Sequence, residues 1–344
     1  MLKSPNTSAQ TSQNNCLLFI PGFKGSILID KSGNQIWPNF IRSQFNQNTS
    51  LRYEDNHNGA PNYQSQDIIH SVPLIPKLLA YDVYGKFVIE LQKQLPATTA
   101  FSIFHYDWRQ DLQQVATQLK AQIDSHTKQG IGSIDFICHS MGGLIVANLL
   151  KAMKVNIVRK VFFVGTPFQG VPRVILDLIQ GTRLGLNKSL LSAQAMASFP
   201  SLYYLLPRLP EFTNGHDFFN LETWQQYKIG YYARNDENIE FLARQLKIAN
   251  DFYHQLENLS STKVTNTKLF FIHSLKHSTP TKLSLMPSID LKPSKGDGTV
   301  PENSLAVPSY LRNFDHQLLT IDKLHGKSFS CETVLKFILD NLSS

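Results

Sequence analysis

Short apolar segments alternate with helical patterns along much of this chain, and this alternation limits its fold more than any other feature. Strands are predicted at the apolar runs 16–20, 101–106, 133–138, 160–165, 268–274 and 317–322. Apolar residues at helical spacing predict helices over 82–95, 109–128, 142–153 and 329–342. Strands that alternate with helices are typical of a mostly parallel sheet with flanking helices. We therefore predict an α/β fold.

The alternation stops after Pro167 and resumes at residue 268. Residues 168–265 have helix- and loop-like patterns with apolar patches such as FPSLYYLLP at 199–207. The simplest interpretation is a core formed by 16–167 and 266–344, interrupted by a cap or lid insertion over 168–265. Residues 1–15 are polar and predicted to be disordered. Residues 34–80 are predicted to be a loop-like excursion that contacts a membrane, with VPLIPKLLA at 72–80 as its apolar part.

The strongest chemical signal is the run CHSMGG at 138–143, between a predicted strand and a predicted helix. A serine at such a junction sits on a sharp turn that exposes its hydroxyl above the sheet. The turn needs small residues two positions away on either side, and Gly142 is one of them. Cys138 stands where the usual pattern has glycine, so the turn must avoid a conformation that only glycine adopts. We predict that Ser140 is a nucleophile.

A serine nucleophile needs a base and an acid that orients the base. In this kind of fold the chain order is serine, then Asp or Glu, then His. Asp297 in the turn GDGT and His325 in LHG occur in that order after predicted strands. Competing candidates are His139, Asp107 and Asp322, together with a metal-binding pair formed by His273 and His277. The histidines at 105, 216, 254 and 316 are interpreted as structural or exposed.

The tetrahedral intermediate needs two inward-facing amides. The N–H of Met141, directly after the nucleophile, is one predicted donor. The other is the N–H of Phe23, in the glycine-containing loop PGFKGS that follows the first strand. That loop lacks the spacing of a phosphate-binding loop, so nucleotide binding is not expected.

Charge and composition indicate which partners, cofactors and cellular locations are expected for this protein. A net charge of +7 and a pI near 9.1 favour anionic partners, including acidic phospholipid surfaces. No dense Lys/Arg run indicates nucleic-acid binding, no Cys-x-x-Cys pair indicates zinc, and neither a metal nor an organic cofactor is expected. The sequence shows no signal peptide and no membrane-spanning segment, which predicts a cytoplasmic or non-classically exported protein with peripheral membrane association. The oligomeric state is left open.

Taken together, the motifs resemble the lecithin:cholesterol acyltransferase family, which includes lysosomal phospholipase A2. The matching segments, in family order, are FIPGFKGS (19–26), WP (37–38), YDWR (106–109), HSMGG (139–143), GTPFQG (165–170), FPSLYYLLP (199–207), GDGTVP (296–301) and His325. The resemblance implies an α/β-hydrolase core with a cap and a membrane-binding segment. It also implies a Ser140–Asp297–His325 triad, an oxyanion hole formed by Phe23 and Met141, and transfer of a lipid acyl group to water or an alcohol. Asp107 and Arg109 are interpreted as structural.

The sequence therefore favours a serine-dependent lipid ester hydrolase or acyltransferase that acts through an acyl-enzyme on Ser140. Two alternatives stay open. One is a different serine hydrolase, a thioesterase or a peptidase. The other is a catalytically inactive lipid-binding protein.

Overall fold

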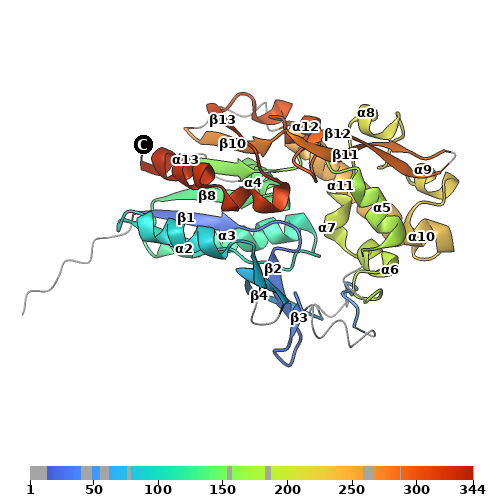
Figure 1. Cartoon of the computed structure of the whole chain (residues 1–344), viewed down its shortest axis with the longest axis horizontal. Helices are drawn as coiled ribbons and strands as arrows, with labels where there is room; N and C mark the ends of the chain where they lie inside the picture. Colours follow the sequence, from blue (N-terminus) through green and yellow to red (C-terminus); the bar gives the residue numbers. More distant parts are fainter. Residues whose placement is uncertain are drawn as a thin grey trace, which may run out of the picture.

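A central parallel sheet organises the chain, as the computed structural model shows for residues 14–39, 49–54, 62–75, 79–152, 157–182, 187–258, 266–286 and 288–343. Strand β1 (Asn15–Ile20) lies between β7 (Thr99–Ile103) and β8 (Ser133–His139). Beyond β8 the sheet continues through β9 (Val158–Val164), β10 (Lys268–Ser274) and β13 (His316–Ile321). All neighbouring strands in this six-stranded sheet are parallel (Figure 1). The predicted α/β class is confirmed.

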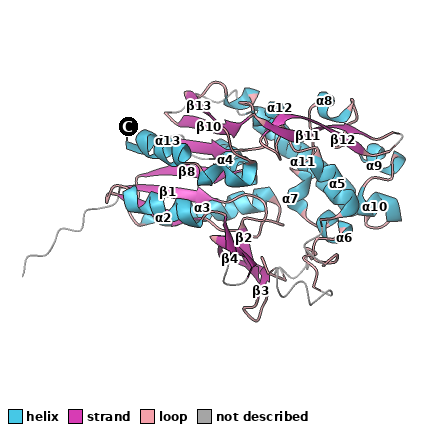
Figure 2. Cartoon of the chain, in the orientation of Figure 1, coloured by secondary structure: helices cyan, strands magenta, loops and turns pink. Residues whose placement is uncertain are grey.

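Helices cover both faces of the sheet (Figure 2). Helices α2 (Gly85–Gln94) and α13 (Glu332–Ser343) share one apolar cluster with Phe19 and Phe162. Helices α3 (Leu112–Lys128) and α4 (Met141–Ala152) share the other with Leu18 and Phe136. The two apolar clusters lie on opposite faces of the sheet, because successive side chains of a strand such as β1 point to opposite faces.

The register of the sheet brings several strand ends to one edge. Ile20 at the end of β1 lies opposite Cys138, and His139 at the end of β8 lies opposite Val164. Val164 in turn lies opposite Ile272 of β10. The loops that leave β1, β8 and β9 therefore start side by side, which is where binding sites form in parallel sheets.

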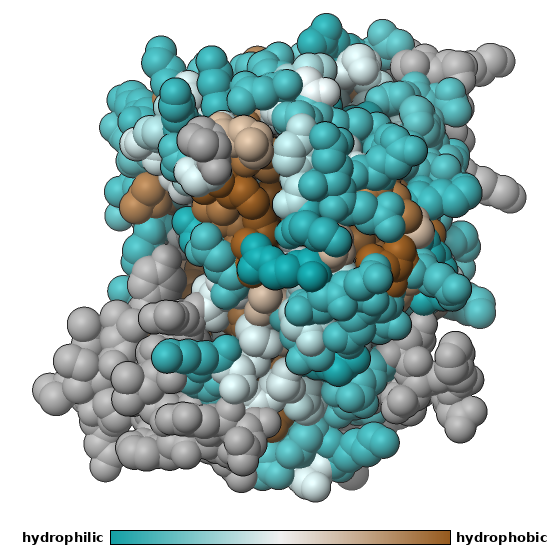
Figure 3. Space-filling view, turned by 90° about the vertical axis from the view of Figure 1, so that its right-hand side faces the viewer, coloured by the Kyte–Doolittle hydropathy of each residue, from teal (hydrophilic) through white to brown (hydrophobic). Residues whose placement is uncertain are grey.

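Short helices fill most of the chain between β9 and β10. They are α5 (Arg173–Gln180), α6 (Ala193–Ala197), α7 (Pro200–Tyr203), α8 (Pro210–Thr213), α9 (Leu221–Gln226), α10 (Gly230–Asn235) and the longer α11 (Ile239–Glu257). Prolines in the first turn of α7 and α8 and side-chain caps from Ser192 and Asn220 explain where α6, α7, α8 and α9 begin. Helices α5 to α10 gather at the end of the sheet towards which the strands point (Figure 1). Seen from that side, apolar side chains form two patches framed by hydrophilic ones (Figure 3).

Three small antiparallel sheets complete the fold, and the alternating pattern of the sequence did not predict them. Strand β2 (Ser26–Ile29) pairs with β3 (Gln35–Trp37) and β4 (Gln64–Ile68), and β5 (Ser71–Ile75) pairs with β6 (Leu79–Asp82). The prediction of a loop-like excursion over 34–80 missed β3, β4, β5 and β6, because strands of five residues or fewer are too short to give a clear alternating period. Residues 76–78 of the apolar segment 72–80 lie outside the described residues. The third pair is β11 (His277–Ser284) with β12 (Asp290–Gly296).

Several element boundaries also differ from the prediction. Helix α3 begins at Leu112 rather than at 109, because the Asp111 side chain accepts hydrogen bonds from the first-turn amides. The predicted strand 101–106 is β7 at Thr99–Ile103, and the last helix begins at Glu332, after the 3-10 helix η3 (His325–Ser330). Two short helices, α12 (Glu302–Leu305) and η2 (Ser309–Leu311), precede β13. Among the described helices, none has both the length and the apolar character that crossing a membrane requires.

Candidate active site

Ser140 occupies a strained turn between β8 and α4. Its φ angle is 51°, a left-handed conformation that costs free energy in a residue other than glycine. The turn is held by hydrogen bonds from Ser140 N to Val164 O and from Gly143 N to Ser140 O, each 2.9 Å long. Cys138 lies one residue before the end of β8, is fully buried and has no left-handed φ. The position where many such turns have glycine does not need one here.

The turn around Ser140 packs closely against the loop after β1. A Cβ atom at Gly142 would lie 2.6 Å from Pro21 O, and one at Gly22 would lie 2.8 Å from Ser140 Cβ. Real Cβ atoms do not approach other atoms so closely. Glycine at both positions therefore lets the loop that carries Phe23 lie against the serine.

The structure brings Ser140, His325 and Asp297 into one hydrogen-bonded row. His325 Nε2 lies 2.9 Å from Ser140 Oγ, and His325 Nδ1 lies 2.6 Å from Asp297 Oδ2. The backbone is tied as well, since His325 N donates to Asp297 O at 2.8 Å. With Nδ1–H directed at the carboxylate, the Nε2 lone pair faces the serine hydroxyl. This arrangement can remove the hydroxyl proton.

The Asp297 carboxylate is held in its charged form. Its Oδ1 accepts the N–H groups of Thr299 at 2.9 Å and Val300 at 2.7 Å, while Oδ2 accepts from His325. Burial raises the pKa of Asp297, but the His325 imidazole and the two amides outweigh it, and the pKa lies below its usual value. The turn GDGT thus supplies an ionised acceptor for the imidazole.

Gly165 is a part of the site that sequence reasoning missed. It follows β9 with a φ of 63°, and a Cβ there would lie 3.0 Å from His325 Nδ1 and 3.4 Å from Asp297 Oδ2. A side chain at this position would press on the imidazole and the carboxylate. The detectable signal was a glycine directly after an apolar strand, in the segment GTPFQG.

The amides of Phe23 and Met141 lie in two segments that adjoin Ser140. Met141 is the first residue of α4, and Phe23 directly follows Gly22, which faces Ser140. Within the described parts of the chain, neither N–H donates a hydrogen bond. The Phe23 ring packs edge-on against Trp108 at a centroid distance of 5.0 Å. Both amides thus belong to segments that adjoin Ser140.

The competing residues lie elsewhere or have other partners. His139 Nδ1 is 2.7 Å from the Tyr84 hydroxyl, and Asp322 is exposed beside Lys276. His273 on β10 contacts Thr320 Oγ1 at 3.1 Å. Within the described residues, no group of three or more His, Cys, Asp or Glu side chains is placed to hold a metal ion. His277 Nε2 lies 3.5 Å from Asp322 Oδ1. The four histidines predicted to be structural or exposed contact Ser65 (His105), Tyr227 (His216), Glu257 (His254) and Phe314 O (His316).

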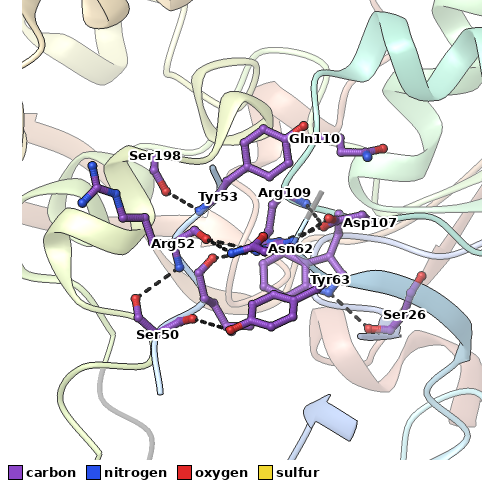
Figure 4. Close-up of polar contacts among 12 residues, drawn as sticks. Ser26, Ser50, Arg52, Tyr53, Asn62, Tyr63, Asp107, Arg109, Gln110 and Ser198 are labelled. Atoms are coloured by element: carbon purple, nitrogen blue, oxygen red, sulfur yellow. Dashed lines mark hydrogen bonds and ion pairs between the residues drawn. The ribbon is translucent and has the colours of Figure 1, made fainter. Parts of the chain in front are cut away.

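Asp107 and Arg109 form a buried ion pair with each other (Figure 4). Arg109 donates to Asp107 from Nε at 2.9 Å and from Nη2 at 2.6 Å. Its Nη1 donates to Leu51 O at 2.9 Å and contacts Arg52 O at 3.3 Å. The pair therefore fastens segment 49–54 to the core.

Comparisons with known proteins agree with this architecture. A family model described as Lecithin:cholesterol acyltransferase matches residues 81–284. No curated protein matches the chain. A chain in the crystal structure of the Tle4-Tli4 complex is similar with a TM-score of 0.60 and 12% identity, covering 95% of this chain and 98% of that chain. The mature lipase BlEst2 of Bacillus licheniformis has a TM-score of 0.43 and 13% identity, covering 97% and 94%. At such identities the first similarity concerns the fold alone.

Proposed function

The chain belongs to the lecithin:cholesterol acyltransferase family, and from this membership we propose that it cleaves the acyl ester of a lipid through an acyl-enzyme on Ser140. The family supports a lipid ester hydrolase or acyltransferase. The acyl-enzyme mechanism is supported by the continuous row of hydrogen bonds from Ser140 Oγ through His325 to Asp297. A hydroxyl, an imidazole and a buried carboxylate in this order form the arrangement that activates serine nucleophiles.

In the first half of the reaction, His325 Nε2 takes the hydroxyl proton while Ser140 Oγ attacks the ester carbonyl. The negative oxygen of the tetrahedral intermediate is stabilised by the N–H groups of Phe23 and Met141, with added support from the N-terminus of α4. Asp297 stabilises the imidazolium that forms. The intermediate collapses when His325 returns the proton to the leaving alcohol, and the acyl group stays on Ser140.

In the second half, His325 takes a proton from water or from an acceptor alcohol, whose oxygen attacks the acyl-enzyme. Collapse of the second intermediate releases the fatty acid or the new ester, and Ser140 regains its proton. Each proton transfer uses a group of this chain, so the proposed cycle requires no metal or organic cofactor.

The helical segment 168–265 is proposed to act as the cap over this site. Helices α5 to α10 lie at the end of the sheet where Ser140 is found, and that side of the molecule carries two apolar patches (Figures 1 and 3). Acyl chains require apolar surroundings, which fits this location. Segment 34–80 and the net charge of +7 are proposed to favour contact with an anionic lipid surface.

The proposal is tested by incubating the protein with mixed lipid vesicles, with and without a soluble alcohol, and identifying products by mass spectrometry. We expect free fatty acid without the alcohol, a new ester with it, and neither with Ser140→Ala. A protein that consumes only soluble acyl thioesters or peptides is a different serine hydrolase. Vesicle binding without any product indicates a lipid-binding protein and rejects the enzymatic proposal.

A further inference from the structure

A second histidine lies against the proposed triad without being part of it. His139 directly precedes Ser140, is 8% exposed, and its ring lies 4.9 Å from the His325 ring at an angle of 33°. Its Nδ1 is 2.7 Å from the Tyr84 hydroxyl. One edge of this buried imidazole is therefore fixed, and one face packs near the base.

The same Tyr84 hydroxyl also touches the loop after β1. Gly22 N donates to it at 3.2 Å, and Gly22 directly precedes Phe23, whose amide is a proposed oxyanion donor. Tyr84 is 3% exposed, and its ring packs edge-on against Phe19 at 5.1 Å and Phe329 at 5.7 Å. A single buried hydroxyl thus joins the oxyanion loop to the imidazole that lies beside His325.

The direction of these hydrogen bonds follows from their donors. The hydroxyl oxygen accepts the Gly22 N–H, and the hydroxyl proton can be donated to His139 Nδ1, which lies 2.7 Å away. Burial first, and the neighbouring His325 second, lower the pKa of His139 to about 3. His139 is therefore neutral at neutral pH, and its Nδ1 can accept. A neutral neighbour also does not oppose the positive charge that His325 gains in the reaction.

We infer that Tyr84 and His139 act as one positioning unit that holds the His325 ring and the oxyanion loop in their relative places. The inference rests on the proposed function, since both parts it connects are proposed to act on the ester. Tyr84 and His139 touch no reacting atom in this account. They act through Gly22 on one side and through His325 on the other.

The test replaces the hydroxyl alone. Tyr84→Phe keeps the ring and its contacts with Phe19 and Phe329 but releases both Gly22 N and His139. We expect kcat for a short-chain soluble ester to fall on the order of 10-fold or more, with KM changed by less than about 2-fold, because small misplacements of reacting groups slow chemistry without weakening binding.

A matched control loses one buried hydroxyl hydrogen bond far from the site. Thr267→Val removes the bond from Thr267 Oγ1 to Val158 O (2.7 Å) at the opposite end of the sheet, with nearly the same shape. It is expected to leave kcat unchanged. If Tyr84→Phe keeps full kcat, or if both variants lose kcat equally at 25 °C, the inference is wrong.

A double-mutant cycle on Tyr84 and His139 provides a second test. His139→Phe removes the acceptor of the Tyr84 hydroxyl proton. The variant that carries both changes should have a kcat no lower than that of the slower single variant, because either change alone already removes the hydrogen bond between the two residues. If the fold-reductions in kcat of the two single variants multiply in the double variant, the inference is wrong. If His139→Phe does not fold, the comparison of Tyr84→Phe with Thr267→Val decides alone. A wild-type protein that cleaves no ester rejects the proposed function instead, so the two failures are distinguishable.

Discussion

The buried ion pair of Asp107 and Arg109 permits a quantitative test of how the fold is held together. The two side chains are 3% and 0% exposed, and Arg109 uses Nε and Nη2 on the carboxylate while Nη1 serves the carbonyls of Leu51 and Arg52. The change we consider is Arg109→Met, which keeps the length of the side chain and removes its charge and donors.

The expected cost follows from what is left behind. Asp107 would remain buried with a charge and no cation, and removal of one partner of such a pair costs about 3–5 kcal/mol. The carbonyl of the buried Leu51 would also lose its Nη1 donor, which adds about 1 kcal/mol. We therefore expect the free energy of unfolding to fall by about 4–6 kcal/mol. Arg109→Lys should cost less, because it keeps the charge and loses the planar two-point contact.

The assay is urea unfolding at pH 7, followed by tryptophan fluorescence, because Trp108 lies between the two charged residues in sequence. A double-mutant cycle with Asp107→Asn completes it. The double variant should be more stable than the sum of the single losses predicts, by on the order of 3 kcal/mol. Losses that add within about 0.5 kcal/mol, or a cost below about 1 kcal/mol for Arg109→Met, would show that the ion pair does not hold segment 49–54 in this way.

Two further predictions concern the neighbourhood of Ser140. The unfolded chain binds a proton at His139 near pH 6.5, whereas burial and His325 lower the folded pKa to about 3, so stability falls as the pH drops through this window. Urea titrations should show a loss of about 2 kcal/mol from this group between pH 7 and pH 5, absent in His139→Phe; an equal loss in both proteins contradicts the cause. Gly22→Ala places a Cβ 2.8 Å from Ser140 Cβ and should reduce ester hydrolysis by roughly 100-fold. Gly132→Ala, whose nearest contact is 3.6 Å, should not; equal activity of the two variants in the same assay would exclude the steric argument.

The sequence predicted the core because its strands are apolar on both faces. Segments such as 133–138 and 268–274 give continuous apolar runs, and strands β8 and β10 lie there. The hairpin of β11 and β12 gave no such signal, since its strands contain Pro280 and Pro293 and alternate only weakly. Its pairing depends on contacts with the rest of the fold, which a local pattern does not contain.

Chain order and turn chemistry predicted the three residues of the candidate site. Ser140, Asp297 and His325 each follow a predicted strand or strand-containing region, and the structure has their atoms within hydrogen-bond distance. The contacts of Gly165 and the link from Gly22 through Tyr84 to His139 could not be predicted in this way. They join residues distant in sequence through backbone atoms and a single hydroxyl. The glycine after the apolar strand is a local signal at 165, but a local signal does not say which distant side chains that glycine will face.

Every step of the proposed reaction depends on a Ser140 nucleophile that His325 and Asp297 activate. The direct measurement is the rate of labelling by a fluorophosphonate probe, with the modified peptide mapped by mass spectrometry. We expect one label on Ser140, with rates lower on the order of 1,000-fold in His325→Gln and Asp297→Asn. A label on another residue, or an undiminished rate in His325→Gln, would contradict it.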